Sequence, residues 1–225
     1  MINMALLEVK GISKSFGESQ IIADSSLVVE AGDTIAFMSP SGSGKSTMLS
    51  MVGLLLTPDS GQIITPDGID ALTLGDKEIS RLRSRMFGFI FQSTQLVGSL
   101  RAIENVTAPA GFAGKLDFDV EERAKELLVK FGLEDRLYHY PHQLSVGQRR
   151  RVAVARALLL SPKIVIADEP TNDLDEESAT LVADALFEYA AQGNALLYAT
   201  HLSALADRAN AVMTLDGKTF VKSTR

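Results

Sequence analysis

Short apolar runs alternate with longer helical patterns along this chain, which predicts a mixed α/β fold. Nearly continuous apolar runs are typical of strands buried in a parallel sheet, and they occur at 33–38, 162–170 and 194–201. More mixed runs predict further strands at 6–16 and 26–38. Turn-forming residues suggest one hairpin at 57–68 and another at 211–223, where Asp216 and Gly217 supply the turn.

The middle of the chain, from about residue 93 to residue 160, shows helical spacing instead. The clearest helix is predicted at 119–132, where Asp119 and Glu122 can form a capping pair and Gly132 can end the helix. The apolar residues that share one face of this helix are Val120, Ala124, Leu127, Leu128 and Phe131.

Helical spacing is also present at 45–56, directly after a stretch rich in small residues. A short helix followed by a strand that ends at Gln92 is expected within 76–92. The chain shows no repeat, low-complexity tract or linker. We therefore expect one domain, residues 1–225, in which a strand-rich core (1–92 and 161–225) is interrupted by a helical subdomain (93–160).

Composition narrows the possible classes of protein. The chain has 225 residues, 46% of them hydrophobic, which is enough for a substantial core. Its formal net charge of −6 argues weakly against a nucleic-acid-binding surface spread over the whole chain. The absence of cysteine excludes a disulfide framework and a thiolate metal site, in agreement with a reducing cytoplasm. We expect neither a signal peptide nor a membrane-spanning helix, because no apolar run is long enough.

The stretch FMSPSGSGKST, at 37–47, nearly matches the phosphate-binding pattern G-x-x-x-x-G-K-[ST]. In such a loop the backbone N–H groups point at phosphate oxygens, and the following helix adds the positive end of its dipole. Gly42 and Gly44 have no Cβ, so the backbone can curl closely around the phosphates. Lys45 is expected to reach the β- and γ-phosphates, and the Ser46 hydroxyl is expected to bind Mg²⁺.

Ser39 departs from this pattern, because it stands at the first glycine position. The residue at that position only begins the turn, so a serine costs about 1–2 kcal/mol if its φ is positive and almost nothing if its φ is negative. Thr47 supplies one more hydroxyl, which we expect near the α-phosphate. The alternative interpretation is a solvent-exposed turn before an ordinary helix.

Two carboxylates, Asp168 and Glu169, end the apolar run that begins at Lys163. The carboxyl ends of strands are where open α/β sheets bind ligands. Asp168 can hold Mg²⁺ through water, and Glu169 can act as the general base toward an attacking water molecule. The alternative is a solvated acidic turn.

The stretch LSVGQRRR, at 144–151, predicts the start of a helix, because Ser145 and Gln148 have the spacing of a capping box. Gly147 leaves backbone exposed in the first turn, and such a helix start is an anion site. Three arginines follow at 149–151; they conflict with the positive end of the helix dipole, and a bound phosphate would relieve that conflict. The alternative is an ordinary capped helix with a basic surface face.

Taken in order, these motifs resemble those of a nucleotide-binding subunit of an ATP-binding-cassette (ABC) transporter, over essentially the whole chain. The resemblance implies further site residues: an adenine-stacking aromatic at Phe16, the Q-loop glutamine at Gln92, the D-loop aspartate at Asp175 and the switch histidine at His201. Val146 departs from the family pattern, because it replaces the first glycine of the signature, and its φ must be negative for the helix to start. The D-loop asparagine–aspartate pair is also less usual for the family.

The resemblance assigns three sets of residues. The expected catalytic residues are Glu169, His201 and Gln92. The expected Mg²⁺ ligands are Ser46, Gln92 and Asp168. The residues expected to bind ATP are Phe16, Ser39, Ser41, Gly42, Ser43, Gly44, Lys45, Ser46, Thr47, Ser145, Gly147, Gln148 and Asp175.

The implied fold is an α/β P-loop NTPase, with a RecA-like core, an antiparallel β subdomain and an inserted α-helical subdomain. The implied protein is an ATPase that uses ATP and Mg²⁺. It forms a head-to-tail pair with a second copy of itself and powers a separate transmembrane permease. It would then lie in the cytoplasm, on the inner face of the cell membrane, with no nucleic-acid partner.

Within the family, the stretches at 88–106 and 132–145 resemble the subgroup that includes macrolide-efflux, lipoprotein-release, haem-efflux and cell-division systems. They are most similar to the haem-efflux ATPases, which implies export of haem or another hydrophobic cargo. One alternative is an ATP-dependent regulatory module that acts through a membrane partner without transport. Another is a protein that binds nucleotide without hydrolysing it, against which Glu169, His201 and Gln92 argue.

Overall fold

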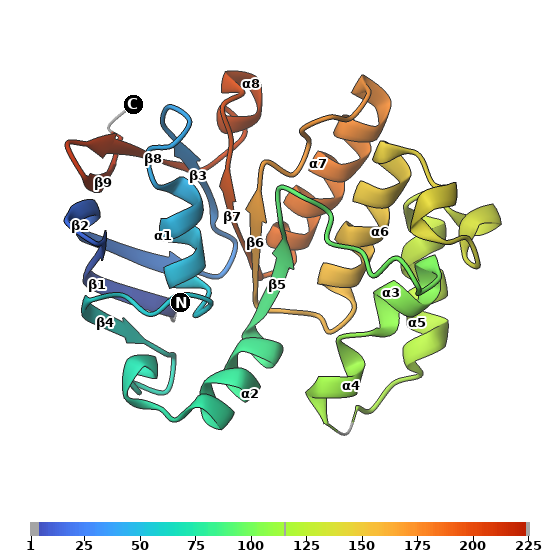
Figure 1. The fold of residues 1–225 in the computed structure, drawn as a ribbon, viewed down its shortest axis with the longest axis horizontal. Coiled ribbons are helices and arrows are strands. Elements are labelled where there is room, and N and C mark those ends of the chain that lie inside the picture. The colour runs from blue at the N-terminus through green and yellow to red at the C-terminus, as the bar shows by residue number, and fades with distance from the viewer. Residues whose placement is uncertain (1–4, 115, 224–225) are drawn as a thin grey trace.

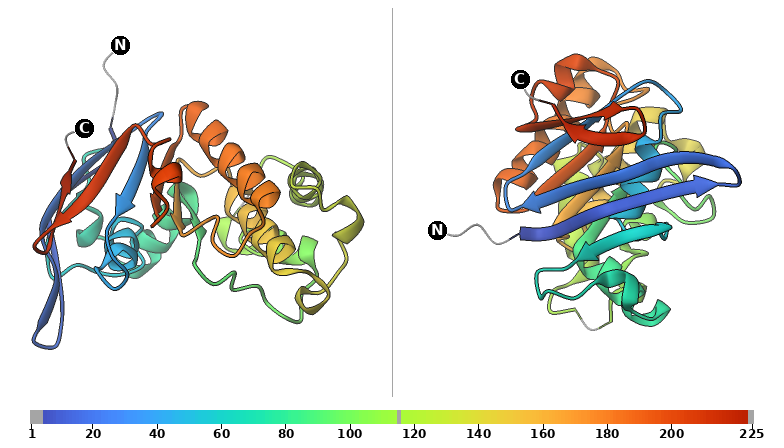
Figure 2. Two further views of the ribbon diagram at one scale, coloured as in Figure 1. Left: turned by 90° about the horizontal axis from the view of Figure 1, so that it is seen from above. Right: turned by 90° about the vertical axis from the view of Figure 1, so that its left-hand side faces the viewer.

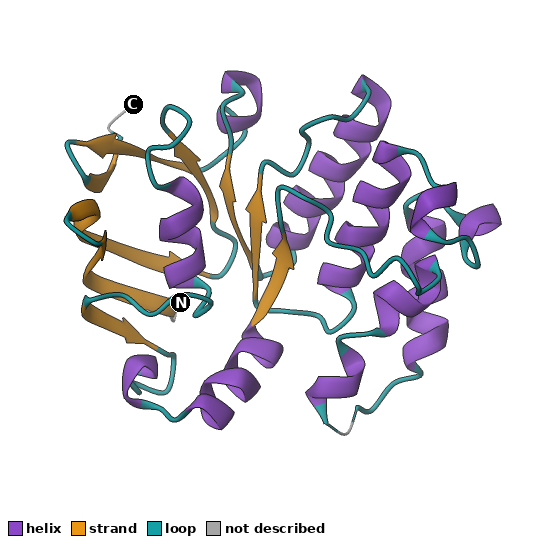
Figure 3. Ribbon diagram, viewed as in Figure 1, coloured by secondary structure: helices purple, strands orange, loops and turns teal. Residues whose placement is uncertain are grey.

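The computed structural model describes residues 5–114 and 116–223. It contains two β-sheets with helices packed around them (Figures 1 and 3). The strands are β1 (Ala5–Phe16), β2 (Ser19–Glu30), β3 (Thr34–Met38), β4 (Ser60–Ile64), β5 (Phe87–Ile90), β6 (Ile164–Asp168), β7 (Ala195–Ala199), β8 (Ala211–Asp216) and β9 (Thr219–Lys222). The helices are α1 (Lys45–Val52), α2 (Asp76–Met86), α3 (Ala102–Thr107), α4 (Ala110–Ala113), α5 (Val120–Lys130), α6 (Val146–Leu158), α7 (Glu176–Ala191) and α8 (Ser203–Ala206).

The larger sheet has the strand order β5-β6-β7-β3-β8-β9. Its strands are parallel except for β9, which pairs with β8 in an antiparallel hairpin whose turn contains Gly217 (φ 60°). Strands β6 and β7 are buried along nearly their whole length, because other elements cover both faces of the sheet. The predicted buried parallel strands and the predicted C-terminal hairpin are both confirmed.

This sheet separates two hydrophobic cores. Helix α1 and the three-stranded sheet β2-β1-β4 cover one face, and helices α3, α5, α6 and α7 contribute to the core on the other (Figures 1 and 2). Alternate residues of β3 serve the two cores: Ile35 and Phe37 pack toward α1, whereas Ala36 packs toward the helical side. The phosphate loop and the helix that starts at Ser145 therefore belong to different cores.

The clearest predicted helix forms as α5. Asp119 is its N-cap and accepts hydrogen bonds from the backbone N–H groups of Glu121 and Glu122, although the return bond of a capping box is not made. Gly132 follows the helix with φ 62°. On the inner face Leu128 and Phe131 are fully buried, and burial of each such side chain stabilises the fold by about 1.5–3 kcal/mol.

Several boundaries differ from the prediction. The predicted helix at 45–56 ends at Val52, because the chain turns at Gly53 and at Leu54, which has φ 57°. The run at 57–68 forms only a minimal hairpin, one antiparallel bridge between Ile64 and Asp70, and β4 makes its ladder with β1 instead. The predicted strand at 26–38 is two strands, β2 and β3, that lie in different sheets.

The connection between the core and the helical region is also less regular than predicted. Strand β5 ends at Ile90, two residues before Gln92, and no helix begins until Ala102. Residues 91–101 are an irregular segment with a single left-handed residue, Gln95 (φ 45°). Within the part of the chain that the structure describes, no helix has both the length and the apolar character needed to cross a bilayer.

Strand register brings the candidate residues to one edge of the sheet. Phe37 near the end of β3, Ala199 at the end of β7 and Asp168 at the end of β6 lie side by side in the ladder. The three segments that leave these strands are the phosphate loop, the turn to His201 and the turn to Glu169. In a parallel sheet the carboxyl ends meet at the same edge, so these segments converge there.

Candidate active site

The phosphate loop connects β3 to α1. Gly42 and Gly44 have φ values of 76° and 98°, in the left-handed region that glycine adopts without penalty. A Cβ on Gly44 would lie 2.8 Å from the side chains of both Ile21 and Ile22 of β2, so the loop also packs too closely for a larger residue. The backbone conformation therefore favours glycine at both positions.

Lys45 is the first residue of α1, and it is largely buried. Its ammonium group donates to the carbonyl oxygens of Ser39, at 2.6 Å, and Pro40, at 3.1 Å. The charge is therefore held over the first residues of the loop rather than directed into solvent. A phosphate oxygen is a stronger acceptor for an ammonium group than a neutral carbonyl, so this charge is well placed for an anion in the loop.

Ser39 begins the loop without backbone strain. It is not among the non-glycine residues with positive φ, so the left-handed penalty considered for this position does not arise. Its hydroxyl makes a 2.5 Å hydrogen bond with the hydroxyl of Ser43, across the turn. The position does not need the conformational freedom of glycine, and the serine adds a side-chain hydrogen bond inside the loop.

We expect the Ser39→Gly variant to change the affinity for ATP by no more than about tenfold. The variant loses one hydroxyl–hydroxyl bond, which contributes about 0.5–1.5 kcal/mol, and about 1.4 kcal/mol corresponds to tenfold in affinity. Titration with ATP measures this effect. The matched control is Ser43→Ala, which removes the other hydroxyl of the same hydrogen bond. A gain of several hundredfold in Ser39→Gly would mean that the natural loop is defective.

A hydroxyl and a carboxylate meet beside the loop. Ser46, in the first turn of α1, donates its hydroxyl to Oδ2 of Asp168, at the end of β6, at 2.5 Å. Oxygen ligands of these two kinds are the ones that Mg²⁺ prefers, usually one or two from the protein with water and phosphate completing the shell. The donor set that the structure brings together here therefore fits Mg²⁺.

Glu169 and His201 form the second pair. His201 Nδ1 lies 3.0 Å from Glu169 Oε2, and the histidine side chain is 57% exposed whereas the glutamate side chain is 12% exposed. Glu169 has φ 49°, a left-handed conformation that is unfavourable for a non-glycine residue. Its backbone N–H donates to the carbonyl of Ala199, which fixes this conformation from the neighbouring strand. Both ends of the glutamate are therefore held by the segment at the end of β7.

The capping box predicted at the start of α6 is confirmed. Ser145 Oγ accepts from the backbone N–H of Gln148 at 3.1 Å, and Gln148 Oε1 accepts from the backbone N–H of Ser145 at 2.9 Å. Val146 begins the helix without positive φ, so it is tolerated as expected. A Cβ on Gly147 would lie 3.7 Å from Oδ2 of Asp175, so the signature segment and the D-loop are adjacent in one chain.

Asp175 is the N-cap of α7 and accepts hydrogen bonds from Ser178, through its backbone N–H at 2.8 Å and its hydroxyl at 3.0 Å. The backbone and the side-chain hydrogen bonds from Ser178 lower the pKa of Asp175. This carboxylate therefore stays ionised, at the exposed edge where α6 and α7 both begin.

The three arginines at 149–151 find partners within the chain itself. Each donates to backbone carbonyl oxygens of another segment. Arg149 donates to Leu144, Arg150 to Phe91 and Gln92, and Arg151 to Phe131. Carbonyl dipoles therefore offset the unfavourable position of these charges near the positive end of the helix dipole. Arg150 is buried, so it does not belong to a basic surface face.

The remaining predicted residues lie around these pairs. Phe16, at the turn between β1 and β2, is 53% exposed, with Lys14 Nζ 5.8 Å from its ring centroid. Gln92 is exposed just beyond β5, and its backbone carbonyl accepts from Arg150. Ser41 is exposed at the tip of the phosphate loop, and Thr47 is half-buried in α1.

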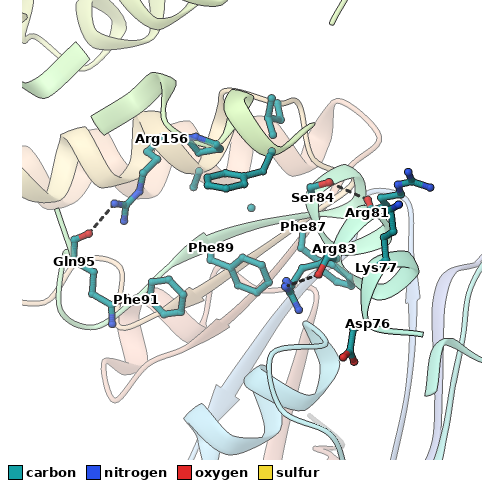
Figure 4. A pocket seen from close by; sticks show the side chains of 16 residues that line it. Asp76, Lys77, Arg81, Arg83, Ser84, Phe87, Phe89, Phe91, Gln95 and Arg156 are labelled. Carbon is teal, nitrogen blue, oxygen red and sulfur yellow. Dashed lines mark hydrogen bonds between the residues drawn. The ribbon is translucent and has the colours of Figure 1, made fainter. Parts of the chain in front are cut away.

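A groove of about 820 Å³ lies between the core and the helical region, bordered by α2, β5, α4 and α6. Phe87, Phe89 and Phe91 line it as a row of stacked rings, with centroids 6.0 and 5.8 Å apart (Figure 4). Arg81 and Arg156 add positive charge to the same lining. The groove therefore offers an aromatic floor with basic groups around it.

Arg150 is the candidate functional residue that the sequence did not reveal. Its guanidinium contacts the backbone of the Gln92 segment, although the two residues are far apart in sequence. The only available signal was an arginine at 150 in a helix pattern whose neighbours at 152–155 are apolar, which indicates a position that faces the core.

The sheet order, the phosphate loop and the carboxylates beside it define the class of P-loop nucleoside triphosphate hydrolases. A sequence model described as ABC transporter matches residues 22–172, which is more than half of the chain. The chain belongs to the ABC transporter family and is an ATPase cassette of that family. The predicted fold class and family are thereby confirmed.

Relatives of two kinds are similar to this chain in sequence. The chain is 41% identical over 219 residues to the lipoprotein-releasing system ATP-binding protein LolD of Hyphomonas neptunium, an alignment that covers 95% of this chain and 96% of that protein. It is 39% identical over 226 residues to the macrolide export ATP-binding/permease protein MacB of Aggregatibacter actinomycetemcomitans, covering 99% of this chain. The chain spans about a third of that relative's length, 35%.

Solved structures agree with this assignment. A dimeric structure of the ATP-binding cassette MJ0796 bound to ADP and Pi matches with a TM-score of 0.89 at 32% identity, covering 97% of this chain and 98% of that one. A second dimeric structure of the same cassette matches with a TM-score of 0.87. That cassette is dimeric in both structures.

Proposed function

We propose that this chain is the ATP-hydrolysing part of a membrane transporter and that it drives a transmembrane permease. One observation carries the proposal. The starts of α1 and α6 both lie at the upper edge in Figure 1, but strands β6 and β7 and helix α7 lie between them. Two helix starts of the kind that can bind anions, on one side of the fold and separated by these elements, would be explained by a head-to-tail pair of chains with two ATP molecules between them.

In this proposal one chain binds the phosphates through the backbone N–H groups of its loop and through Lys45. Ser41 and Ser43 contribute backbone to that loop, Thr47 lies near the α-phosphate, and Phe16 stacks on adenine. Ser46, Asp168 and Gln92 would hold Mg²⁺, which neutralises charge on the β- and γ-phosphates when bound. The observed Ser46–Asp168 hydrogen bond supports the first two of these ligands.

The second chain completes the site from the opposite side. Its Ser145, Gly147 and Gln148 present the start of α6 to the γ-phosphate, and its Asp175 borders the same interface. Glu169 of the first chain accepts a proton from the attacking water, and His201 orients Glu169 and contacts the γ-phosphate. The 3.0 Å contact between Glu169 and His201 supports this division of roles.

The permease is proposed to dock in the groove between the core and the helical region. The stacked phenylalanines of β5 offer apolar contact for a short coupling helix, and Arg81 and Arg156 favour acidic groups on it. Docking there would hold the protein on the inner face of the cell membrane. It would also link the permease to the Gln92 segment, which begins directly after β5.

The proposed cargo is a hydrophobic molecule. The haem assignment stays a prediction, since the relatives described above carry the names of macrolide export and lipoprotein release. Export of a hydrophobic molecule fits all three systems. Substrate flux through the reconstituted partner separates this function from an ATP-dependent regulatory module, because a regulator would turn over ATP with its partner and move no cargo.

Head-to-tail pairing is tested with the Ser145→Arg variant. We expect its monomer to bind ATP within about threefold of wild type, because Ser145 serves the nucleotide of the other chain. ATP-driven pairing should be lost, since a long charged side chain fills the contact. Light scattering of Glu169→Gln, with and without Ser145→Arg, measures the dimer that ATP traps. In the wild type, hydrolysis should rise faster than linearly with protein concentration.

The control is Ser80→Arg, which makes the same change at an exposed position in α2, away from the starts of α6 and α7. It should leave pairing unchanged in the isolated chain. Loss of ATP binding in the Ser145→Arg monomer, or an intact ATP-trapped dimer, would contradict the head-to-tail arrangement.

A further inference from the structure

Helix α6 holds the Gln92 segment through a buried arginine. Arg150 is 2% exposed, and its Nη1 and Nη2 donate to the carbonyl oxygens of Phe91 and Gln92, each at 2.6 Å. Burial lowers the pKa of the guanidinium, while the charges of Asp173 and Asp168 act in the opposite direction. Such a group is expensive to bury, and most of its compensation comes from these two short bonds.

A second arginine of the same helix extends this contact. Arg156 donates to the carbonyl oxygens of Thr94 and Gln95, both at 2.9 Å, and Figure 4 shows the bond to Gln95. The ladder between β5 and β6 ends at the pair Ile90–Ala167. From Phe91 onward, four carbonyl oxygens of the segment are therefore bound by α6, after its pairing to the sheet has ended.

The geometry links two parts of the proposed site. Helix α6 begins at the Ser145 cap, and Arg150 lies in its second turn, so a rigid helix connects them. A displacement of the start of α6 must carry the backbone of Gln92 with it, as long as the two bonds to Arg150 are kept. We propose that Arg150 is a positioning residue that ties Gln92 to the signature helix and so couples pairing of the chains to the placement of Gln92.

This inference rests on the proposed function, which gives Gln92 its role beside Mg²⁺ and the γ-phosphate. A purely structural role for Arg150 is the competing explanation. Arg151 offers the matched control, because it makes the same kind of bond, 2.8 Å to the carbonyl of Phe131 at the end of α5. Its Nε, like that of Arg150, is buried without a hydrogen-bond partner among the described residues. The two arginines hold different segments, and Arg150 is more deeply buried and binds two carbonyl oxygens where Arg151 binds one.

The test compares Arg150→Met with Arg151→Met in the full chain. We expect Arg150→Met to lower kcat about tenfold or more, because the variant loses two hydrogen bonds made by a charged group. The Mg²⁺ concentration for half-maximal activity should rise severalfold, while the affinity for ATP stays within about threefold. Backbone amides at 92–95 should exchange hydrogen faster. Arg151→Met should leave both the Mg²⁺ dependence and the exchange at 92–95 as in the wild type.

Arg150→Lys serves if the methionine variant does not fold. It keeps the charge but offers a point donor in place of a planar fork, so it can satisfy one carbonyl well and not both. We expect its Mg²⁺ dependence and its exchange rates to lie between those of the wild type and Arg150→Met. Wild-type behaviour of Arg150→Lys in both measurements would overturn the inference.

A double-variant cycle with Gln92→Ala separates this inference from the proposed function. If Gln92→Ala alone keeps full activity, the proposed role of Gln92 fails. If Gln92→Ala lowers activity, the Arg150 variant should add less than about twofold on that background, because it acts through Gln92. The same tenfold loss on both backgrounds would show that Arg150 acts independently, and the inference would be wrong.

Discussion

The Glu169→Gln variant is expected to bind ATP within about threefold of the wild type and to lose turnover by about 10²–10⁴-fold. An amide of the same shape can keep the contact with His201, which is 3.0 Å in the wild type. It cannot accept a proton from the attacking water, and a positioned general base contributes about that factor to the rate. Phosphate release and nucleotide binding, measured on one preparation, give both quantities.

The control for this variant is Glu188→Gln, the same substitution at an exposed position near the far end of α7. It should leave turnover unchanged. Turnover of Glu169→Gln near the wild-type rate would remove Glu169 from the proposed role. A large loss of ATP affinity would instead mean that the carboxylate, through its neighbour Asp168, supports the binding of the nucleotide.

The Lys45→Ala variant should weaken ATP binding by about 10-fold to 100-fold. The ammonium group of Lys45 is already held over the loop by the carbonyl oxygens of Ser39 and Pro40, so little ordering remains when a phosphate binds. Loss of a hydrogen bond to a charged group costs about 1.5–3 kcal/mol, which corresponds to this range of affinities. Calorimetric titration with ATP measures the change.

Lys125→Ala removes an ammonium group from the surface of α5, where it pairs with Glu121, and controls for a general loss of positive charge. It should bind ATP as the wild type does. A folded Lys45→Ala protein with unchanged affinity would place the nucleotide somewhere other than this loop. Thermal unfolding of both variants distinguishes a lost contact from a lost fold.

The fold was predictable where local chemistry and tertiary contacts agree. The Ser145–Gln148 capping box and the apolar face of α5 carry their own signals, and both elements form as predicted. The run at 57–68 has turn residues at both ends, so it suggests a local hairpin. Beyond a single local bridge to Asp70, its partner is β1, far back in the chain, and the pattern within the run says nothing about a distant partner.

The candidate site was predictable in its members but not in its contacts. The phosphate-loop pattern indicated Lys45, and the end of a buried apolar run indicated Asp168 and Glu169. The sign of φ at Ser39, on which the cost of that serine depends, is a property of the folded turn and needed the structure. The same holds for Arg150, because a helix pattern shows which positions face inward and not which backbone they meet.

The strand order of the larger sheet has a consequence for how this protein is made. Strand β3 leads directly into the phosphate loop, yet its two neighbours are β7 and β8 from the last part of the chain: Phe37 pairs with Ala199 on one side and Met213 on the other. During synthesis β3 therefore has no strand to pair with until nearly the whole chain has left the ribosome. We expect nascent chains in that interval to expose an unpaired apolar strand edge, which is the kind of surface that chaperones bind. A chain truncated before β7 would contain the complete phosphate-loop sequence without the sheet that holds it in shape.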